Sequence, residues 1–360
     1  MAEAPVLVAH QNLHAFLVRM LGAMKMPTDR AEITAGLMVR TDLRGVDSHG
    51  IGMLPRYHEL WREGFIVMEA DPVVERDDLA TGVMDGRKGL GHYVSSLAMR
   101  RAIEKAKTYG LGMVVVHGSN HYGAAANYSM MALEHDMIGL STTNSASVAM
   151  VPTFGRAAKI ATNPISFAAP ARRHAPFVLD MATTTVAVGK LSVASRWKKP
   201  IPAGWALDDS GEATTDPFVA LKTRLLTPLG GSRDLGSHNG YGLGVMVDIL
   251  SGVLSGGVYG DLFWRRDDLK EQHRHNLGHC FAAIDPARFR PLAEFKADMD
   301  DMIESLRRTP PADGQTRVYV AGEPEAECEV KRRAEGIPVA PVLVDKVNEI
   351  AGSLKVAPLA

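Results

Sequence analysis

The sequence predicts an α/β fold with an additional helical part at the N-terminus. Two helical patterns fill most of the first 43 residues, and helical and strand-like segments then follow one another in mixed order. The chain contains no repeat of fixed period and no low-complexity tract. With 360 residues, of which 46% are hydrophobic and 22% charged, it has the composition of an ordinary soluble globular protein with enough apolar material for a core.

The N-terminal helices are predicted from apolar residues that recur every three or four positions. The first helix is expected over 10–26, where Leu13, Phe16 and Leu17 share one face. The second is expected over 30–43, with a polar cap at 28–29. The segment around His49 follows directly after the second helix.

The sequence from His92 onward predicts a helix, a strand and a second helix. The helix 92–109 is stopped by Gly110, because glycine readily adopts the left-handed conformation that ends a helix. A strand of β-branched residues follows at 112–116, and another helix starts near Ala124. His121 therefore lies between a strand and a helix, and ligands of open α/β sheets collect at such carboxyl ends of strands.

The remaining elements follow from the same periodicities. Strands are predicted at 137–141, 165–168, 177–180 and 280–284, helices at 242–254, 292–307, 324–335 and 342–352, and long Pro- or Gly-rich loops at 199–216 and 228–236.

These elements divide the chain into two parts with approximate boundaries. We expect residues 1–75 to form a helical part that carries the Asp47-Ser48-His49-Gly50 motif and packs with the C-terminal segment 310–360. Residues 76–309 are expected to form the α/β core that binds cofactor and substrate.

Charge and cysteine content exclude several classes of protein. A formal net charge of −1 argues against a nucleic-acid surface. Two cysteines, Cys280 and Cys328, cannot make a disulfide framework and fit a reducing cytoplasm. The N-terminus lacks the features of a signal peptide, and no apolar run reaches the roughly 18 to 20 residues that span a bilayer. We therefore expect a cytoplasmic protein with no nucleic-acid or membrane partner.

Two histidine motifs are the first candidates for chemistry. One is Arg44-Gly45-Val46-Asp47-Ser48-His49-Gly50 and the other is Ser119-Asn120-His121-Tyr122-Gly123. Each places a histidine among small polar residues and glycines at the end of an apolar segment. Imidazole is the natural acid or base near neutral pH, so the two could transfer protons, although a histidine beside a glycine is more often a turn residue.

No standard nucleotide-binding motif is present. The glycines of Gly86-Arg87-Lys88-Gly89-Leu90-Gly91 have the wrong spacing for a Rossmann fingerprint, and no Walker A sequence occurs. Pattern alone therefore leaves cofactor binding undecided.

Six segments spread over nearly the whole chain resemble a known family in order and approximate spacing. They are DLRGVDSHGIGMLPRY, GSNHYGAAANYSMMALEHDMIGLSTTNS, ATNPISFAAPA, FVLDMATTTVAVGKL, PAGWALDDSGEATTDP and GSHNGYGLGVMVDILSGVLSGG. The family is that of the type 2 malate/L-lactate dehydrogenases, nicotinamide-dependent oxidoreductases unrelated to the Rossmann-type lactate dehydrogenases. The resemblance implies a fold of the family's own, with a mixed central sheet unlike Rossmann's, and an active site at a homodimer interface.

The resemblance assigns proton transfer to the two histidines. Hydride transfer from a 2-hydroxy acid needs a base for the hydroxyl proton, groups that hold the carboxylate, and a nicotinamide against C2. His121 resembles the base of ureidoglycolate-type members, and His49 resembles the proton donor of diketogulonate-type members. Either histidine could instead orient the other or the substrate. Ser48 and Asn120 are expected to fix a tautomer or bind a substrate oxygen.

The substrate residues depart from the family pattern at one position. Many members have an arginine four residues after the histidine of the DSHG motif, where it can bind a substrate carboxylate with two hydrogen bonds. This chain has Met53 there, and Arg44 and Arg56 are the nearby replacements. The Gly-Met sequence resembles the broad-specificity hydroxycarboxylate dehydrogenases.

The resemblance also implies the cofactor residues, for NAD or NADP. Where the family has lysine next to the cofactor phosphate or ribose, this chain has Asn239, which keeps hydrogen bonding but loses the charge, and Lys190 is a nearby substitute. The cofactor-binding residues implied are Ser145, Asp180, Met181, Ala182, Lys190, His238, Asn239, Gly240, Gly322 and Glu323.

The expected function is that of a homodimeric NAD(P)-dependent dehydrogenase of a small 2-hydroxy acid such as malate or lactate. One alternative is a reductase of a cyclic imine acid or a diketo sugar acid, which uses the same hydride chemistry. A second is a metal-dependent hydrolase built on His273, His275, His279 and Cys280, whose spacing fits no standard zinc site, so no metal is expected. A third is a ligand-binding relative without activity.

Overall fold

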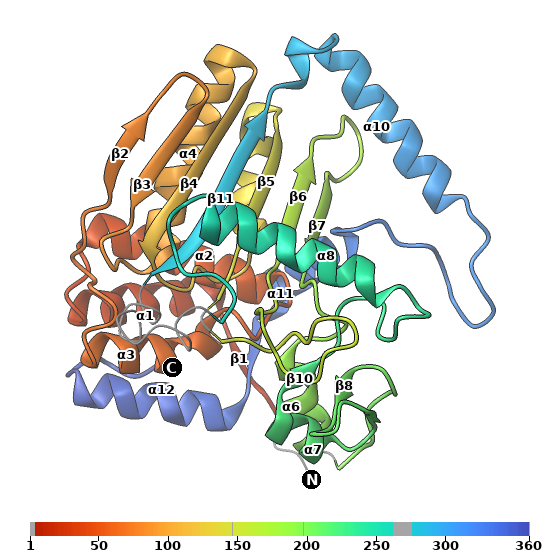
Figure 1. Ribbon diagram of the computed structural model, residues 1–360. Coiled ribbons are helices and arrows are strands. Elements are labelled where there is room, and N and C mark those ends of the chain that lie inside the picture. Colours follow the sequence, from red (N-terminus) through yellow and green to blue (C-terminus); the bar gives the residue numbers. More distant parts are fainter. Residues whose placement is uncertain (1–3, 146, 197, 262–275, 360) are drawn as a thin grey trace.

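A seven-stranded mixed sheet forms the centre of the protein (Figure 1). The computed structural model describes residues 4–145, 147–196, 198–261 and 276–359. The strand order is β2-β3-β4-β11-β5-β6-β7, and β3 and β4 are parallel while the other neighbours are antiparallel. The strands are β2 (Val73–Asp77), β3 (Thr81–Asp85), β4 (Leu111–Ser119), β5 (Ile138–Thr143), β6 (Ile165–Ala169), β7 (Phe177–Met181) and β11 (Leu277–Ile284). This sheet is not a parallel Rossmann sheet, which confirms the predicted fold class.

The middle strand of the sheet, β11, is buried on both faces. β11 pairs with β4 on one side and β5 on the other, and its residues 277–283 are all buried. Helix α4 (Gly91–Tyr109) packs on one face and ends at Gly110, whose φ of +83° is the left-handed conformation expected from the sequence. A Cβ at Gly112 would lie 2.0 Å from the carbonyl oxygen of Ala102, so glycine allows β4 to lie directly against α4.

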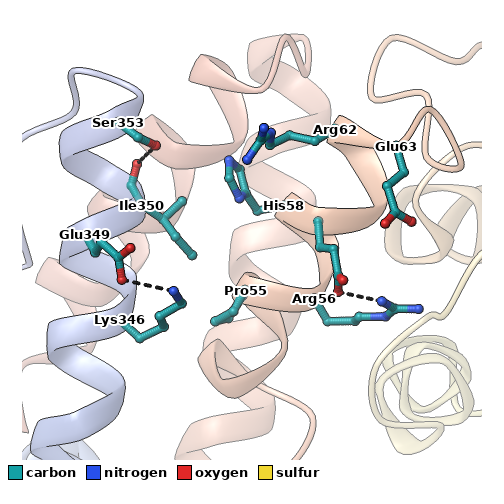
Figure 2. Close-up of a pocket in the computed structure, with 10 residues that line it drawn as sticks. Pro55, Arg56, His58, Arg62, Glu63, Lys346, Glu349, Ile350 and Ser353 are labelled. Carbon is teal, nitrogen blue, oxygen red and sulfur yellow. Dashed lines mark hydrogen bonds and ion pairs between the residues drawn. The ribbon is translucent and has the colours of Figure 1, made fainter.

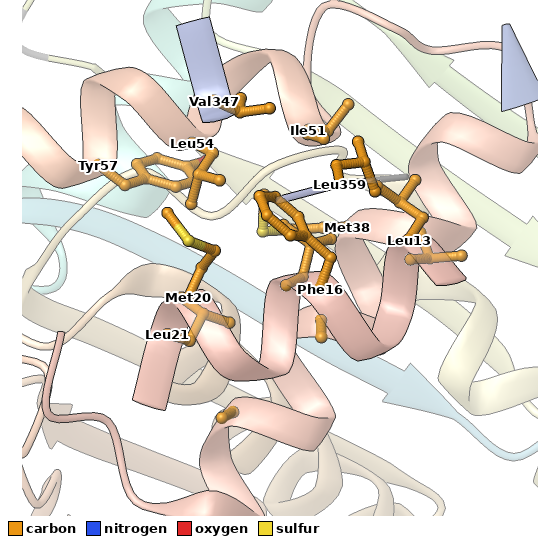
Figure 3. Packing of buried hydrophobic residues seen from close by; sticks show 14 of the residues in the cluster. Leu13, Phe16, Met20, Leu21, Met38, Ile51, Leu54, Tyr57, Val347 and Leu359 are labelled. Atoms are coloured by element: carbon orange, nitrogen blue, oxygen red, sulfur yellow. The ribbon is translucent and has the colours of Figure 1, made fainter. Parts of the chain in front are cut away.

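The N-terminal and C-terminal ends of the chain pack together. Helices α1 (His10–Ala23), α2 (Thr28–Leu43) and α3 (Leu54–Arg62) lie beside α11 (Glu323–Glu335) and α12 (Pro341–Ser353). β1 (Val6–Val8) pairs antiparallel with β12 (Ile337–Val339). Their side chains share one buried hydrophobic cluster, which includes Phe16 and Met20 of α1, Leu54 of α3 and Val347 of α12 (Figure 3).

A third region carries the small secondary structure. A three-stranded sheet of order β10-β8-β9 packs with α6 (Val188–Arg196) and α7 (Pro217–Thr223). The sequence predicted a loop over 199–216, but β8 (Ala206–Leu207) and β9 (Ala213–Thr214) lie within it. They were not predicted, because a strand of two residues is too short to show a period. The third strand is β10 (Leu225–Leu226).

Helix α8 (Ser237–Asp248) continues as a π-helical turn over Ile249–Val253 and crosses the face of the sheet opposite α4 (Figure 1). Helix α10 (Leu292–Arg307) stands apart from the sheet (Figure 1). The remaining elements are short: α5 (Ala126–Ser129) and 3-10 turns at Ile51–Met53, Met130–His135 and Pro286–Arg288. No helix in the described part of the chain is long and apolar enough to cross a membrane.

Candidate functional site

A cleft of about 910 Å³ brings together two distant parts of the sequence. On one side lies the loop between α2 and α3, which we call the histidine wall and define by the lining residues 45–49, Gly52 and Met53. The opposite side is formed by segments after β5, before β10 and in the first part of α6. We call it the cationic wall and define it by Ser145, Ser147, Lys190, Ser192 and Arg224.

The histidine wall is held in place by a buried contact from α2 and by more exposed contacts from α11. The carboxylate of Asp42 accepts a hydrogen bond from the Ile51 backbone N–H at 2.8 Å, and a Cβ at Gly50 would overlap that carboxylate. Burial raises the pKa of Asp42 to about 7. Arg332 of α11 donates to the Asp42 carbonyl oxygen and forms an ion pair with Asp47. The loop that carries His49 is therefore fixed by both ends of the chain.

His49 and His121 lie next to each other, with ring centroids 5.4 Å apart. Ser48 Oγ lies 2.7 Å from His49 Nδ1, and the hydroxyl of Tyr57 lies 2.7 Å from His121 Nδ1. A longer contact, 3.4 Å, joins the Gly123 backbone N–H to the same His121 nitrogen. No residue in the described ranges hydrogen bonds to His121 Nε2, so this nitrogen is available for another partner.

Burial keeps both rings neutral. Desolvation lowers the pKa of His49, and it lowers the pKa of His121 well below its usual value of 6.5, with the neighbouring histidines adding to the effect. Burial also raises the pKa of the Tyr57 phenol, which therefore stays protonated. A neutral imidazole has one nitrogen free to accept a proton, which is the form that a general base needs.

His92 is a third histidine in this group. Its ring is fully buried, and neither ring nitrogen has a partner among the described residues. It meets the Tyr57 ring edge-on at 5.6 Å, and a Cβ at Gly123 would lie 2.6 Å from its Nε2. Burial lowers the pKa of His92 to about 3. His92 therefore packs behind the Tyr57–His121 pair as a neutral ring.

Two predicted substrate residues have other contacts. The Asn120 amide donates to the carbonyl oxygens of Phe65, Lys88 and Gly89, so it fastens the segment before His121 to the core. Arg44 is buried and lies 3.7 Å from Glu329 of α11. Neither side chain lines the cleft.

Arg56 lies at a different depression. It pairs with Glu59 on α3 and lines a surface pocket of about 730 Å³ between α3 and α12, together with His58, Lys346 and Glu349 (Figure 2). Of the residues predicted for the substrate, Ser48, His49 and Met53 line the cleft, whereas Arg56 lies elsewhere.

The predicted cofactor residues fall into three groups. Ser145 and Lys190 line the cleft. Asp180, Met181 and Ala182 end or follow β7, and Asp180 accepts a hydrogen bond from the Ala126 N–H at 2.8 Å. Desolvation by the surrounding protein raises the pKa of Asp180 to about 6, although part of the residue is exposed to solvent.

The third group, like Asp180, Met181 and Ala182, lies outside the lining of the cleft. His238, Asn239 and Gly240 form the first turn of α8, where His238 contacts Arg233 at 2.9 Å. Gly322 packs on Val178 of β7, and Glu323 binds Arg307 and accepts the Val320 N–H at 2.8 Å.

The histidine–cysteine cluster considered for metal is only partly described. His273 and His275 lie outside the described residues. His279 of β11 is buried and bonds to Thr143 Oγ1 at 2.6 Å and to Ser119 Oγ at 2.8 Å, and Cys280 is buried beside it. No cluster that could hold a metal occurs within the ranges that the structure describes.

Sequence reasoning missed three residues of the site: Tyr57, His92 and Arg224. Tyr57 follows the DSHG motif in the same resembling segment, so its place near His49 could have been inferred. The contact of Tyr57 with His121 spans 64 residues and depends on the tertiary fold. Arg224 is a single arginine after a short helix, and no local pattern marks it.

Comparisons with known proteins agree on one family. Residues 8–348 match the family described as malate/L-lactate dehydrogenase. The chain is 39% identical to malate dehydrogenase of Pyrococcus abyssi, over 97% of this chain and 95% of that protein. It is 35% identical to malate/(S)-sulfolactate dehydrogenase of Methanothermus fervidus, over 98% and 99% of the two chains. Hydroxycarboxylate dehydrogenase B of Escherichia coli (strain K12) is 29% identical, over 91% and 89%.

The fold is also that of a solved structure. The crystal structure of malate dehydrogenase from Entamoeba histolytica matches with a TM-score of 0.93 and 33% identity, covering 98% of this chain and 99% of the other.

Proposed function

The chain belongs to the malate/L-lactate dehydrogenase family, and we propose that it oxidises malate and related 2-hydroxy acids at the cleft between the two walls. The family and its relatives make the protein a hydroxy-acid oxidoreductase that uses a nicotinamide cofactor. The predicted function is confirmed to that extent, and neither the reductase nor the hydrolase alternative is favoured. The observation that carries the proposal is the pair of neutral imidazoles 5.4 Å apart, one of which lines the cleft.

His121 is the proposed base. Its low pKa keeps the ring neutral, and Tyr57 occupies Nδ1, so Nε2 exchanges the proton of the substrate hydroxyl. In the tautomer that leaves a lone pair on Nε2, Nδ1 carries the hydrogen and donates it to the Tyr57 hydroxyl, so the 3.4 Å contact between Nδ1 and the Gly123 N–H is not a hydrogen bond in this state. After proton transfer the imidazolium would still donate Nδ1–H to Tyr57. His49, fixed by Ser48, would hold the substrate oxygen from the side of the cleft.

The residues of the cationic wall fit a nicotinamide dinucleotide. Serine hydroxyls and the cations Lys190 and Arg224 are suited to phosphate and ribose oxygens. When bound, the nicotinamide ring supplies the hydride acceptor, and the residues of the chain position the substrate and move the proton. We propose NAD as the cofactor, with NADP as the alternative.

The substrate preference is proposed to be broad. Met53 presents an apolar side chain to the cleft where many members have arginine, and neither Arg44 nor Arg56 lines it. A wall without a dedicated cation should tolerate different substituents at C3 of the acid.

We also propose that the protein is a homodimer that acts in the cytoplasm. Exposed apolar side chains follow one another along α8 and the π-helical turn: Leu243, Met246, Ile249, Val253 and Leu254. An apolar face of this kind supports association with a second copy. Both cysteines are free thiols, which fits a reducing compartment.

A nicotinamide absorbance assay tests the proposed reaction. Malate, lactate and 2-hydroxybutanoate are supplied separately with NAD and with NADP, and turnover of all three is expected. If none reduces either cofactor, the proposed activity is wrong. If malate alone is used and 2-hydroxybutanoate is rejected by more than ~1000-fold, a dedicated cation must bind the second carboxylate and the broad preference is wrong.

A further inference from the structure

Two cations of the cleft have no acidic partner. Lys190 and Arg224 both line the cationic wall, and neither makes an ion pair with any residue that the structure describes. Elsewhere in the protein, Arg332 pairs with Asp47 and Arg307 pairs with Glu323, whereas Lys190 and Arg224 are exposed on the wall of the cleft. Two uncompensated positive charges in one cleft indicate a site for an anion.

Arg224, which lines the cleft, has a left-handed backbone conformation. Arg224 follows α7 in the left-handed conformation, with φ of 52° and ψ of 33°, and its N–H donates to the Ala220 carbonyl oxygen at 2.9 Å. This conformation favours glycine and strains other residues. The chain nevertheless has an arginine there, and its Nη2 donates to Ser147 Oγ at 3.1 Å.

Ser147 connects Arg224 to the segment expected to contact the cofactor. The Ser147 backbone N–H donates to Ser145 Oγ at 3.2 Å, and both serines line the cleft. Asn239, which stands where family members have lysine, is exposed on α8 and does not line the cleft. The positive charges in the lining of the cleft therefore come from positions 224 and 190, and position 239 does not contribute to it.

We propose that Arg224 and Lys190 form a phosphate subsite for the dinucleotide cofactor, with Ser145 and Ser147 as hydroxyl donors. This inference rests on the proposed function and names the group that the cationic wall recognises. Arg224 can bind two phosphate oxygens at once, while Lys190 acts as a point charge. The phosphate is either the pyrophosphate, common to both cofactors, or the 2′-phosphate found only in NADP.

Binding titrations separate these sources without relying on turnover. NADH and NADPH are titrated by their fluorescence, and ADP-ribose, which lacks the nicotinamide, by calorimetry. The central variant is Arg224→Gly, because glycine suits the left-handed backbone and removes only the side chain. Lys190→Ala is the second variant. Lys222→Ala is the matched control, since Lys222 is an exposed cation of α7, the helix that Arg224 follows, and lies outside the cleft lining.

Arg224→Gly should weaken cofactor binding ~10- to 100-fold, Lys190→Ala ~10-fold, and Lys222→Ala less than ~2-fold. Equal losses for NADH, NADPH and ADP-ribose would assign the pyrophosphate, and a loss for NADPH alone would assign the 2′-phosphate. Unchanged binding of all three probes by Arg224→Gly would overturn the proposal, and so would a loss confined to the KM for malate. Thermal melting of each variant shows that it is folded. A parent protein that binds neither NADH nor NADPH would instead refute the proposed function.

Discussion

The two walls of the cleft are built in different ways. On the histidine side, Asp42 fixes the loop, Tyr57 fixes His121, and His92 packs behind Tyr57, all within buried surroundings. On the cationic side, long side chains reach the cleft from a short helix and from the residue that follows another, and the hydrogen bond from Arg224 to Ser147 is exposed. Proton transfer depends on atoms held to within fractions of an ångström, whereas attraction of a charged group tolerates movement. The difference in burial therefore follows the difference in the chemistry proposed for each wall.

The largest expected effect is at His121. Replacing it with alanine should lower kcat at least ~100-fold while cofactor affinity stays near that of the parent, because loss of a general base usually costs two to four powers of ten. Steady-state kinetics together with NADH titration measure both quantities. His49→Ala should lower kcat to a similar degree; a change confined to the KM for the acid would make His49 a positioning residue. Activity of His121→Ala within a few-fold of the parent would show that His121 is not the base.

A smaller effect is expected at Tyr57. Tyr57→Phe keeps the ring that packs on His92 but removes the hydroxyl at His121 Nδ1, so the imidazole loses its orienting partner. We expect kcat to fall ~10-fold, on the scale of one lost hydrogen bond of about 1.5 kcal/mol. The pH profile of kcat for malate oxidation should also change. In the parent, the low pKa of His121 keeps the base neutral, so kcat should persist below pH 6.5. An unchanged kcat and an unchanged profile would contradict the orienting role of Tyr57.

The smallest effect concerns the support of the histidine wall. The pKa of Asp42 is raised from 3.8 to about 7 on folding, so the folded protein binds this proton more tightly than the unfolded chain. The free energy of unfolding should therefore fall as pH rises from about 4 to about 7 and stay low above that. Asp42→Asn keeps an oxygen for the Ile51 N–H and cannot ionise. It should be more stable than the parent at pH 8 by on the order of 1 kcal/mol.

Urea unfolding at pH 4, 6 and 8 tests this prediction. The advantage of Asp42→Asn should shrink as pH falls toward 4, where the parent carboxyl is protonated as well. Glu59→Gln is a suitable control, because Glu59 is exposed on α3. Equal stability differences at all three pH values would show that ionisation of Asp42 does not affect folding.

Local patterns in the sequence predicted the long elements well. The helix ended by Gly110, the strand that leads to His121 and the helix 292–307 all follow from periodicity and capping. The patterns did not indicate β1, β12 or the two-residue strands, because a few residues are too short to establish a period. They also did not indicate the longer elements β2, β3 and α3. Pairing of β1 with β12 also joins segments that are more than 300 residues apart, and nothing local in either specifies the other.

In the site too, local motifs predicted some residues, whereas others depend on tertiary packing. The grouping of Ser48, His49 and Met53 in the cleft reflects one motif in one loop. Asn120, by contrast, was expected to contact substrate, but its amide is occupied by three backbone carbonyls contributed by other segments. The burial of His92 depends on Tyr57 and Gly123, which come from two other parts of the chain. Such contacts are set by tertiary packing and leave no periodic trace in the sequence.

The joining of the two chain ends has a consequence during synthesis on the ribosome. The loop of His49 is complete only when Arg332 reaches Asp42 and Asp47, and β1 has no partner strand until 337–339 has been made. The first 60 residues therefore cannot complete their packing until nearly the whole chain has left the exit tunnel. Until then the apolar faces of their helices remain uncovered. Nascent chains stalled before residue 330 should remain inactive and depend on chaperones, even though the central sheet is already encoded in them.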